Sequence, residues 1–253
     1  MLETKQLTKS FGEFIALYEV DFHLNEGRIH AIIGPNGAGK TTFFNLVSRI
    51  YPPTSGKIYL NGKGIHDLKP NEVAQLGMAR TFQNICLFPK MNVLENVMVG
   101  RHLFHKTNPF KLFLRIPGKK LEAEEKIKRR AEEYLDFMGL LPFKHQLAES
   151  LPYASQRKLE IARALATEPK LLLLDEPAAG MNPSETGELL DLIEKINRSG
   201  ITILLIEHDM DLVMEISDGV TVLNFGEKIA EGRPEEIRDN PLVVEAYLGK
   251  EEY

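Results

Sequence analysis

The segment Gly34-Pro35-Asn36-Gly37-Ala38-Gly39-Lys40-Thr41-Thr42 decides the fold of this chain. It matches the pattern G-x-x-x-x-G-K-S/T, which forms a glycine-rich loop around the phosphates of a nucleotide. The apolar run Ile29 to Ile33 lies directly before it, and a helical pattern from Thr41 to Ile50 follows. This order of strand, loop and helix predicts an α/β fold in which the segment, here called the phosphate loop, binds a nucleotide.

The phosphate loop has the residue types that phosphate binding requires. Its glycines permit positive φ and carry no Cβ, so backbone N–H groups can turn towards phosphate oxygens at a helix N-terminus. We expect Lys40 to reach the β- and γ-phosphates and Thr41 to offer its hydroxyl to Mg²⁺. The alternative is a glycine-rich turn that matches by accident, and the flanking strand and helix argue against it. The residues predicted to contact the nucleotide are Asn36, Gly37, Ala38, Gly39, Lys40, Thr41 and Thr42.

Composition limits the possible partners and compartments of the protein. The 253 residues include 31 Lys and Arg against 36 Asp and Glu, a net charge of -5, which argues against nucleic acid as a partner. The single cysteine, Cys86, excludes an intrachain disulfide and is expected to be a small buried residue. No apolar stretch approaches about 18 residues and no signal sequence is visible, so we expect a chain that neither spans a membrane nor is secreted.

Apolar runs that alternate with helical patterns predict a mostly parallel core sheet covered on both faces. Beyond Ile29 to Ile33, these runs are Ile58 to Leu60, Leu171 to Leu174 and Ile201 to Ile206, with a helix over Glu185 to Asn197. Two early segments, Leu2 to Leu24 and Lys57 to Gly62, alternate apolar with polar residues and predict an antiparallel β subdomain.

The rest of the chain completes a single expected domain over residues 1–253. A helical subdomain over approximately residues 84–167 is predicted as an insertion in the nucleotide-binding core. Residues Thr221 to Gly232 predict a closing hairpin that turns at Gly226.

Two adjacent carboxylates, Asp175 and Glu176, end the apolar run Leu171 to Leu174. We expect this strand to lie beside the phosphate-loop strand, with Asp175 orienting Mg²⁺ and Glu176 reaching the water that attacks the γ-phosphate. A pair of strand-end acids held by neighbouring arginines is the alternative, and the phosphate loop favours the catalytic interpretation.

Further motifs, in order along the chain, resemble the nucleotide-binding domain of ABC transporters over essentially the whole sequence. They are Gln83 after Arg80-Thr81-Phe82, Leu151-Pro152-Tyr153-Ala154-Ser155-Gln156-Arg157 before Ile161-Ala162-Arg163-Ala164-Leu165, then Asp175-Glu176-Pro177, and Ile206-Glu207-His208-Asp209. The resemblance implies an ATPase of the P-loop NTPase fold that uses ATP and Mg²⁺.

The resemblance also implies roles for three residues outside the loop. Phe11 would stack on adenine, although an aromatic residue before Gly12 could instead belong to the core. Gln83 would contact Mg²⁺ or the attacking water, and His208 would hydrogen-bond the γ-phosphate.

Members of this family act as head-to-tail pairs, so the resemblance implies a second ATPase subunit, identical or different. Each ATP then lies between one protomer's phosphate loop and the other's signature segment. Transmembrane permease subunits are the other implied partners, which would place the chain at the cytoplasmic face of the inner membrane as a peripheral protein.

The signature segment departs from the usual Leu-Ser-Gly-Gly-Gln. Pro152 lacks the hydroxyl and N–H of the usual serine, while the N–H groups of Ala154 and Ser155 remain, and Ser155 is expected to cap the following helix. A weaker ATP site in a pair with a different subunit is one hypothesis. Asn182 occupies the place of an aspartate, and its lack of charge predicts weaker communication between sites.

The residues of these motifs resemble those of the ATPases of branched-chain amino-acid importers, in which a signature segment that begins Leu-Pro-Tyr-Gly is familiar. An ATPase of lipid or lipopolysaccharide export, and a soluble ABC ATPase not linked to transport, are the alternatives. A GTPase or small kinase is disfavoured because no Asn-Lys-x-Asp motif or acceptor lid is present.

Two apolar segments are candidates for contact with membrane components. The resemblance places the groove for a permease helix at Ile85 to Val99, whose apolar residues could equally be packed inside. Residues Leu103 to Ile116 mix aromatic and basic side chains, and a packed surface loop is the favoured interpretation over a membrane-facing one.

Overall fold

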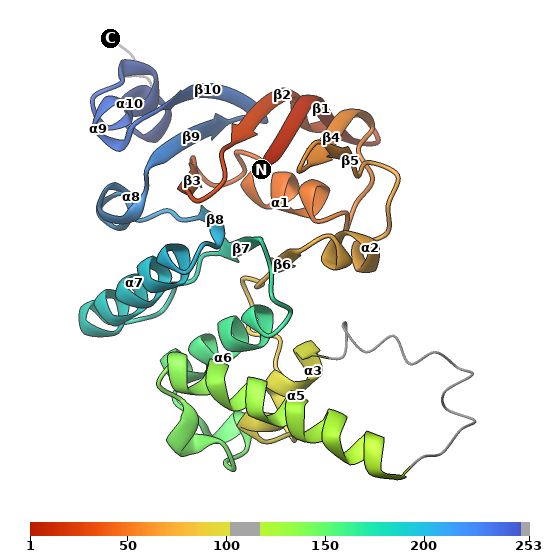
Figure 1. Cartoon of the computed structure of the whole chain (residues 1–253). Helices are drawn as coiled ribbons and strands as arrows, with labels where there is room; N and C mark the ends of the chain where they lie inside the picture. The colour runs from red at the N-terminus through yellow and green to blue at the C-terminus, as the bar shows by residue number, and fades with distance from the viewer. Residues whose placement is uncertain (102–116, 249–253) are drawn as a thin grey trace. The chain divides into compact units, whose positions relative to one another are not determined.

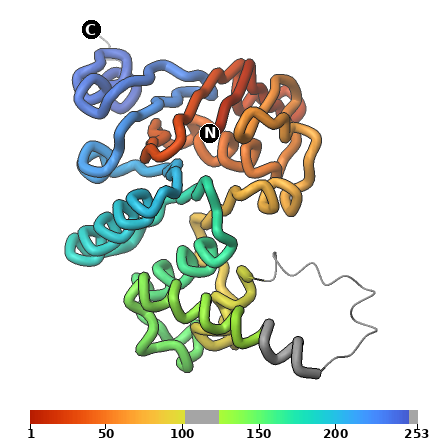
Figure 2. The backbone as a smooth tube through the Cα atoms, viewed as in Figure 1, coloured from red at the N-terminus to blue at the C-terminus, as the bar shows by residue number. Residues whose placement is uncertain are grey.

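The chain divides into two compact units in a computed structural model that describes residues 1–101 and 117–248. The first unit consists of Met1–Arg80, Lys170–Ala179 and Leu190–Tyr253, and the second of Thr81–Pro169 and Gly180–Leu189. The chain leaves the first unit after one strand of its main sheet and returns on the neighbouring strand. Figure 2 traces this course of the backbone from the yellow part of the tube to the green part. The larger segment of the second unit, Thr81–Pro169, is therefore an insertion between two adjacent strands. The surface loop predicted at Leu103 to Ile116 lies outside the described residues.

The main sheet of the first unit has six strands in the order β10-β9-β3-β8-β7-β6, of which only β10 runs antiparallel to its neighbour (Figure 1). Every residue of β3, β7 and β8 is buried, as expected for strands covered on both faces. The strands are β3 (Ile29–Ile33), β6 (Met78–Arg80), β7 (Leu171–Asp175), β8 (Thr202–Ile206), β9 (Gly219–Asn224) and β10 (Glu227–Gly232). The predicted mostly parallel core sheet is thus confirmed, except that Ile58 to Leu60, expected among its strands, belongs to the antiparallel second sheet.

One predicted pair of neighbouring strands in this sheet is wrong. The strand β7 does not lie beside β3, because β8 pairs with both of them and lies between. Strand order depends on which helical crossovers pack on which face, and an apolar run contains no signal for its neighbour. The carboxyl ends of β3, β7 and β8 still meet at one edge of the sheet, since these strands are parallel.

A second sheet of four antiparallel strands, in the order β2-β1-β4-β5, forms the predicted antiparallel subdomain. Its inward residues join one buried cluster with Phe43 and Phe44 of helix α1 and with β7 and β8 of the main sheet. The strands are β1 (Leu2–Phe11), β2 (Phe14–Leu24), β4 (Ser55–Leu60) and β5 (Lys63–Gly64), and α1 spans Lys40–Val47.

The remaining elements of the first unit follow the predicted pattern. The hairpin of β9 and β10 turns at Phe225 and Gly226, both with positive φ, as a tight two-residue hairpin requires. The helices are α2 (Pro70–Gln75), α7 (Pro183–Arg198, whose first turns belong to the second unit), α8 (Met210–Ile216), α9 (Pro234–Arg238) and α10 (Pro241–Leu248).

The second unit is helical. One face of its long helix α5 is buried, through Ile127, Ala131 and Leu135 at helical spacing. Cys86 is exposed, so the expected buried position is wrong; it lies in an irregular segment before α3, where no helix or strand periodicity directs it inward. The elements are α3 (Val93–Arg101), α5 (Pro117–Phe137), η2 (Leu141–Phe143), η3 (Ala148–Ser150) and α6 (Tyr153–Leu165). Within the described residues, no helix combines the length and apolar character that crossing a membrane requires.

Candidate functional site

The phosphate loop connects β3 to α1 and lies against the backbone of two other strands. A Cβ at Gly34, which has φ +148, would lie 2.1 Å from the carbonyl oxygen of Leu223 on β9. A Cβ at Gly39, with φ +101, would lie 2.7 Å from the carbonyl oxygen of Ala16 on β2. Both positions therefore require glycine for space as well as for conformation. The pattern of glycines follows from the close approach of three backbone segments.

Lys40 points back into the loop that precedes it. Its side chain is buried, and Nζ donates to the carbonyl oxygens of Gly34 at 2.6 Å and Pro35 at 3.0 Å. Burial lowers the pKa of Lys40, while the negative charges of Glu176 and Asp175 act to raise it. Both strand-end carboxylates therefore favour the charged form of Lys40.

The other predicted nucleotide contacts occupy the loop and the first turn of α1. Asn36 and Gly37 are exposed, whereas Ala38 is buried and its N–H donates to the carbonyl oxygen of Pro35 at 3.1 Å. Thr41 is exposed and Thr42 is half-buried at the N-terminal end of the helix. The dipole of that helix end favours negative charge near these hydroxyl groups.

Asp175 is held by an arginine, as the alternative interpretation of the acidic pair expected. Arg80 Nη2 donates to Asp175 Oδ2 at 2.8 Å, and both side chains are buried. The other guanidinium nitrogen, Nη1, donates to Asn45 Oδ1 at 2.8 Å and to Ser48 Oγ at 3.0 Å. Burial lowers the pKa of Arg80, and Asp175 opposes that change. The guanidinium therefore links β6, β7 and α1, a role for which the sequence contains no signal.

Glu176 has an uncommon backbone conformation directly after β7. Its φ is +47, in the left-handed region that non-glycine residues rarely adopt, and its N–H donates to the carbonyl oxygen of Ile206 at 3.0 Å. Such strain, of order 1 kcal/mol or more, is concentrated at functional sites. Asp175 is buried whereas Glu176 is half-buried, so the two carboxylates have different surroundings.

The segment after β8 combines an exposed histidine with a buried carboxylate. His208 has a side chain that is 62% exposed, and Glu207 Oε2 lies 3.9 Å from its Nδ1 atom. Glu207 is buried, and its Oε1 accepts a hydrogen bond from the N–H of Ala178 at 3.1 Å. Burial raises the pKa of Glu207, and the charge of Glu176 adds to the increase. Glu207 therefore ties the chain after Glu176 to the chain before His208.

Asp209, the residue after His208, caps helix α8. Its Oδ1 atom accepts hydrogen bonds from the N–H groups of Asp211 at 3.0 Å and Leu212 at 3.3 Å, which caps α8. The His-Asp pair in the sequence therefore contains one candidate functional residue and one helix cap.

Phe11 lies at the exposed end of β1, which excludes the core position considered for it. Its ring is 46% exposed and packs edge to face against Tyr51 with centroids 5.7 Å apart. The ammonium group of Lys9 lies 4.8 Å from the centroid of the Phe11 ring. An exposed aromatic pair beside a cation suits a base-stacking surface.

Gln83 belongs to the second unit, so its proximity to the phosphate loop stays a prediction. Within that unit, Arg157 is fully buried and donates to the carbonyl oxygens of Phe82 and Gln83, each at 2.7 Å. Arg157 also pairs with Glu160 at 2.9 Å. The helix that carries the signature segment therefore fixes the backbone of Gln83.

The signature segment begins α6 one turn earlier than the predicted cap requires. The helix starts at Tyr153 with Pro152 at the N-cap position, so Ser155 lies in the first turn and does not cap the helix. Proline at this position fixes φ and has no N–H to satisfy, which lets the helix begin directly after it. The cap predicted at Ser155 is thus wrong.

Asn182 caps a different helix, α7. Its Oδ1 accepts from the N–H of Glu185, and its own N–H donates to Glu185 Oε2, both at 3.0 Å. This reciprocal pair satisfies two donors at the helix start, which a neutral asparagine does as well as an aspartate.

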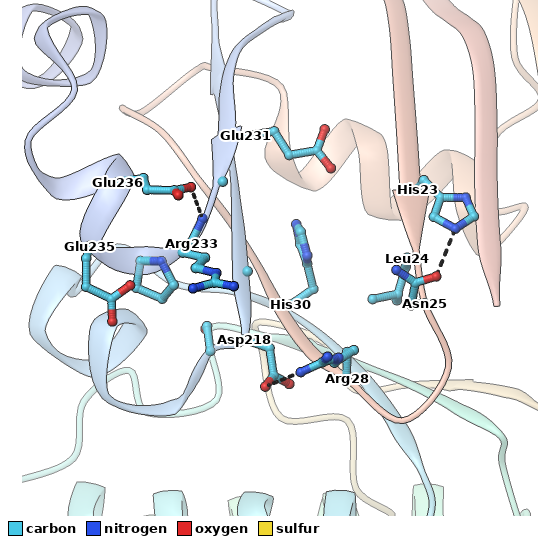
Figure 3. A pocket seen from close by; sticks show the side chains of 14 residues that line it. His23, Leu24, Asn25, Arg28, His30, Asp218, Glu231, Arg233, Glu235 and Glu236 are labelled. Atoms are coloured by element: carbon cyan, nitrogen blue, oxygen red, sulfur yellow. Dashed lines mark hydrogen bonds and ion pairs between the residues drawn. The ribbon is translucent and has the colours of Figure 1, made fainter.

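A cavity of about 620 Å³ lies at the amino ends of β3 and β9, at the opposite edge of the sheet from the phosphate loop (Figure 3). Arg28 pairs with Asp218 at 3.0 Å, and the backbone N–H of Arg233 donates to Glu236 Oε2 at 2.9 Å. His30 lines it and bonds the Thr221 hydroxyl at 2.9 Å. This cavity is separate from the predicted nucleotide site.

Comparison with known proteins agrees with this geometry. A family model described as ABC transporter matches residues 17–179, and one described as branched-chain amino acid ATP-binding cassette transporter matches residues 227–253. The high-affinity branched-chain amino acid transport ATP-binding protein LivG of Salmonella typhimurium is 46% identical over 251 residues, which are 99% of this chain and 98% of that protein.

Solved structures of similar proteins have the same fold. A nucleotide-free ATP-binding cassette from an ABC transporter has a TM-score of 0.86 and 35% identity, over 99% of each chain. A dimeric cassette in a post-hydrolysis state, bound to ADP and Pi, has a TM-score of 0.78 and 27% identity over 92% of this chain and 99% of that one. On both the sequence and the fold, this chain belongs to the ABC transporter family, among its ATP-binding and ATP-hydrolysing proteins.

Proposed function

We propose that this chain is the subunit that hydrolyses ATP to drive import of branched-chain amino acids. The observation that carries the cargo assignment is the near end-to-end match to LivG of Salmonella typhimurium, together with the group-specific match at residues 227–253. An ATPase subunit does not contact the cargo, so the assignment depends on relatedness and on the membrane partners. Lipid or lipopolysaccharide export has no comparable support.

The phosphate loop is proposed to hold the nucleotide, with Phe11 as the surface for the adenine base. Lys40 exchanges its bonds to the carbonyl oxygens of Gly34 and Pro35 for the β- and γ-phosphates. The N–H groups of Gly37 and Gly39 and the amides at the start of α1 complete a positive cradle around the phosphates. Asn36, Ala38 and Thr42 contribute through their backbone or side-chain groups at the same surface.

A Mg²⁺ ion is proposed to bind between the start of α1 and the end of β7. Thr41 offers a hydroxyl and Asp175 a carboxylate, the oxygen ligands that this hard cation prefers, with Gln83 as a further oxygen donor. The shift that Asp175 and Glu176 exert on the pKa of Lys40 supports their closeness to the phosphate site. Bound Mg²⁺ supplies charge neutralisation on the phosphate oxygens.

Glu176 is proposed as the base that accepts a proton from the attacking water. Its left-handed φ turns it out of the strand, while Asp175 stays buried with Arg80. His208 is proposed to donate a hydrogen bond to the γ-phosphate, which its exposed position allows. Gln83 is proposed to respond to the γ-phosphate and to Mg²⁺.

A second ATPase subunit is the first proposed partner. The N–H groups of Ala154 and Ser155 lie in the first turn of α6, where they could meet the γ-phosphate of an ATP held by a second ATPase subunit. A dimeric cassette among the similar structures supports such a pair. Because Pro152 replaces the usual serine, we propose that the site formed by this signature is the weaker one in a pair of different subunits.

The permease subunits are proposed to bind the second unit near Ile85 to Val99. The support is that Phe88 is 43% exposed and Met91 is 39% exposed, whereas Val93, Leu94 and Val97 of the same segment are packed inside the unit. Apolar exposed side chains suit a partner helix. The chain would then act at the cytoplasmic face of the inner membrane as a peripheral subunit.

Uptake in cells tests the proposal. Deletion of the gene should abolish ATP-dependent uptake of radiolabelled leucine, isoleucine and valine, and the wild-type chain should restore it while Lys40→Ala should not. Normal uptake in the deletion strain, with a defect in lipid export, would contradict the cargo assignment.

A further inference from the structure

The C-terminal helix α10 contacts the phosphate loop directly. The hydroxyl of Tyr247 accepts a hydrogen bond from the N–H of Gly34, the first residue of the loop, at 2.9 Å. Burial raises the pKa of this hydroxyl, so it stays protonated and neutral. From this contact we infer that Tyr247 is a positioning residue for the nucleotide site, through which the C-terminal tail sets the affinity for ATP.

The helix that presents Tyr247 is firmly attached to the first unit. Asn240 caps it through a bond from the Leu242 N–H to its side chain at 2.9 Å, and Pro241 starts the helix without an N–H to satisfy. Val243 is 3% exposed and lies one helical turn before Tyr247, whose side chain is only partly covered, with 37% exposed. The buried Val243 and the bond from the Gly34 N–H therefore set the position of the hydroxyl.

Two side chains hold consecutive peptide groups at the entrance to the loop. Tyr247 bonds the N–H of Gly34, which belongs to the peptide group shared with Ile33. Lys40 bonds the carbonyl oxygen of Gly34, which belongs to the next peptide group. No side chain can be added at Gly34 itself, because its Cβ would lie 2.1 Å from the Leu223 oxygen.

ATP binding affects the Lys40 and Tyr247 bonds to Gly34 differently. Lys40 has to leave the Gly34 oxygen when it turns to the phosphates, whereas the Tyr247 hydroxyl faces a group that the phosphates do not need. The tyrosine bond is therefore the contact that keeps the loop entrance in place in the ATP-bound state. Its loss should weaken ATP binding without changing the reacting groups at the end of β7.

The position of the contact in the sequence fits a role specific to this group of ABC proteins. The general family model covers the phosphate loop and ends at residue 179, whereas the branched-chain model covers residues 227–253 and includes Tyr247. The hydrogen bond thus joins a loop common to the family with a tail described for one group. The inference rests on the proposed nucleotide role of the loop.

The test is binding of a fluorescent ATP analogue to the full chain carrying Tyr247→Phe, which keeps the ring and removes the hydroxyl. We expect the affinity to fall about three- to tenfold, the range for loss of one neutral hydrogen bond at a partly exposed site. In the assembled transporter, KM for ATP should rise by a similar factor with kcat unchanged. The melting temperature should stay within about 2 °C of the wild type, since one surface-proximal bond is lost.

Two further variants separate the possible outcomes. Tyr59→Phe removes a hydroxyl from β4 in the same unit and should bind the analogue as the wild type does. Wild-type affinity in Tyr247→Phe, or an equal loss in Tyr59→Phe, would overturn the inference, and so would a loss of affinity that only follows a lower melting temperature. Lys40→Ala tests the underlying function: if it binds the analogue normally, the nucleotide role of the loop fails instead.

Discussion

Replacement of Arg80 by methionine removes a buried cation that holds the strand-end aspartate. Arg80 and Asp175 have side chains that are 6% and 3% exposed, and their N–O distance is 2.8 Å. Methionine fills a similar volume but leaves the Asp175 carboxylate buried without this partner. The bonds from the guanidinium to Asn45 and Ser48 are lost as well.

The burial of this ion pair determines how much stability Arg80→Met should lose. Removal of one partner of a buried ion pair destabilises a protein by about 3 to 5 kcal/mol, because the remaining charge stays desolvated. For a chain of this size, each kcal/mol lowers the melting temperature by roughly 2 to 4 °C, so a decrease of about 10 °C is expected. Combining Arg80→Met with Asp175→Asn should cost less than the sum of the single changes, because the second change removes the buried charge that Arg80 balanced.

Far-UV circular dichroism during urea and thermal unfolding measures these changes, since the chain has no tryptophan for fluorescence. The matched control is Arg28→Met, because Arg28 pairs with Asp218 at a similar 3.0 Å but its side chain is 62% exposed. An exposed pair contributes about 1 kcal/mol or less. The reasoning is refuted if Arg80→Met costs no more than Arg28→Met, or if the double change is simply additive.

Three other perturbations test separate parts of the structure. His30 is buried, which lowers its pKa from 6.5 to about 4. Because the unfolded chain takes up this proton first, the free energy of unfolding should fall by about 3 kcal/mol as the pH drops through that window, and His30→Gln should remove this part of the pH dependence in urea titrations. Gly34→Ala places a Cβ 2.1 Å from a carbonyl oxygen of β9 and should abolish binding of an ATP analogue, whereas Gly187→Ala, with nothing within 4 Å, should bind normally; equal binding by both would count against the steric argument. Glu207→Leu leaves the N–H of Ala178 without its carboxylate acceptor and should cost about 1 to 3 kcal/mol in thermal unfolding, whereas Glu207→Gln keeps an acceptor and should not; identical costs would disprove the tether.

Much of the fold could be predicted because it depends on local patterns. Buried parallel strands leave continuous apolar runs, as in Leu171 to Leu174, and the phosphate loop has a fixed spacing of glycines. Strand order was not predictable in the same way, since β8 is no more apolar than β7 and its place beside β3 depends on helix packing. The exposed position of Cys86 also depends on an irregular segment without periodicity.

The candidate site, like the fold, could be predicted only in part from the sequence. Lys40 and Glu176 were predicted from their motifs. The structure adds a left-handed backbone conformation at Glu176 that no motif indicates. Arg80 and Arg157 act through buried contacts with residues far along the chain, so their functions are not visible in sequence. Tyr247 reaches the phosphate loop across 213 positions of the chain.

The central claim is that the phosphate loop binds ATP and that Glu176 activates the water that attacks it. The most direct measurement is ATP binding and ATP turnover by Glu176→Gln in the complex with its partner ATPase and permease subunits. We predict wild-type affinity for ATP, loss of turnover to the background rate, and accumulation of a closed dimer of ATPase subunits. Undiminished turnover would contradict the assignment of Glu176 as the base.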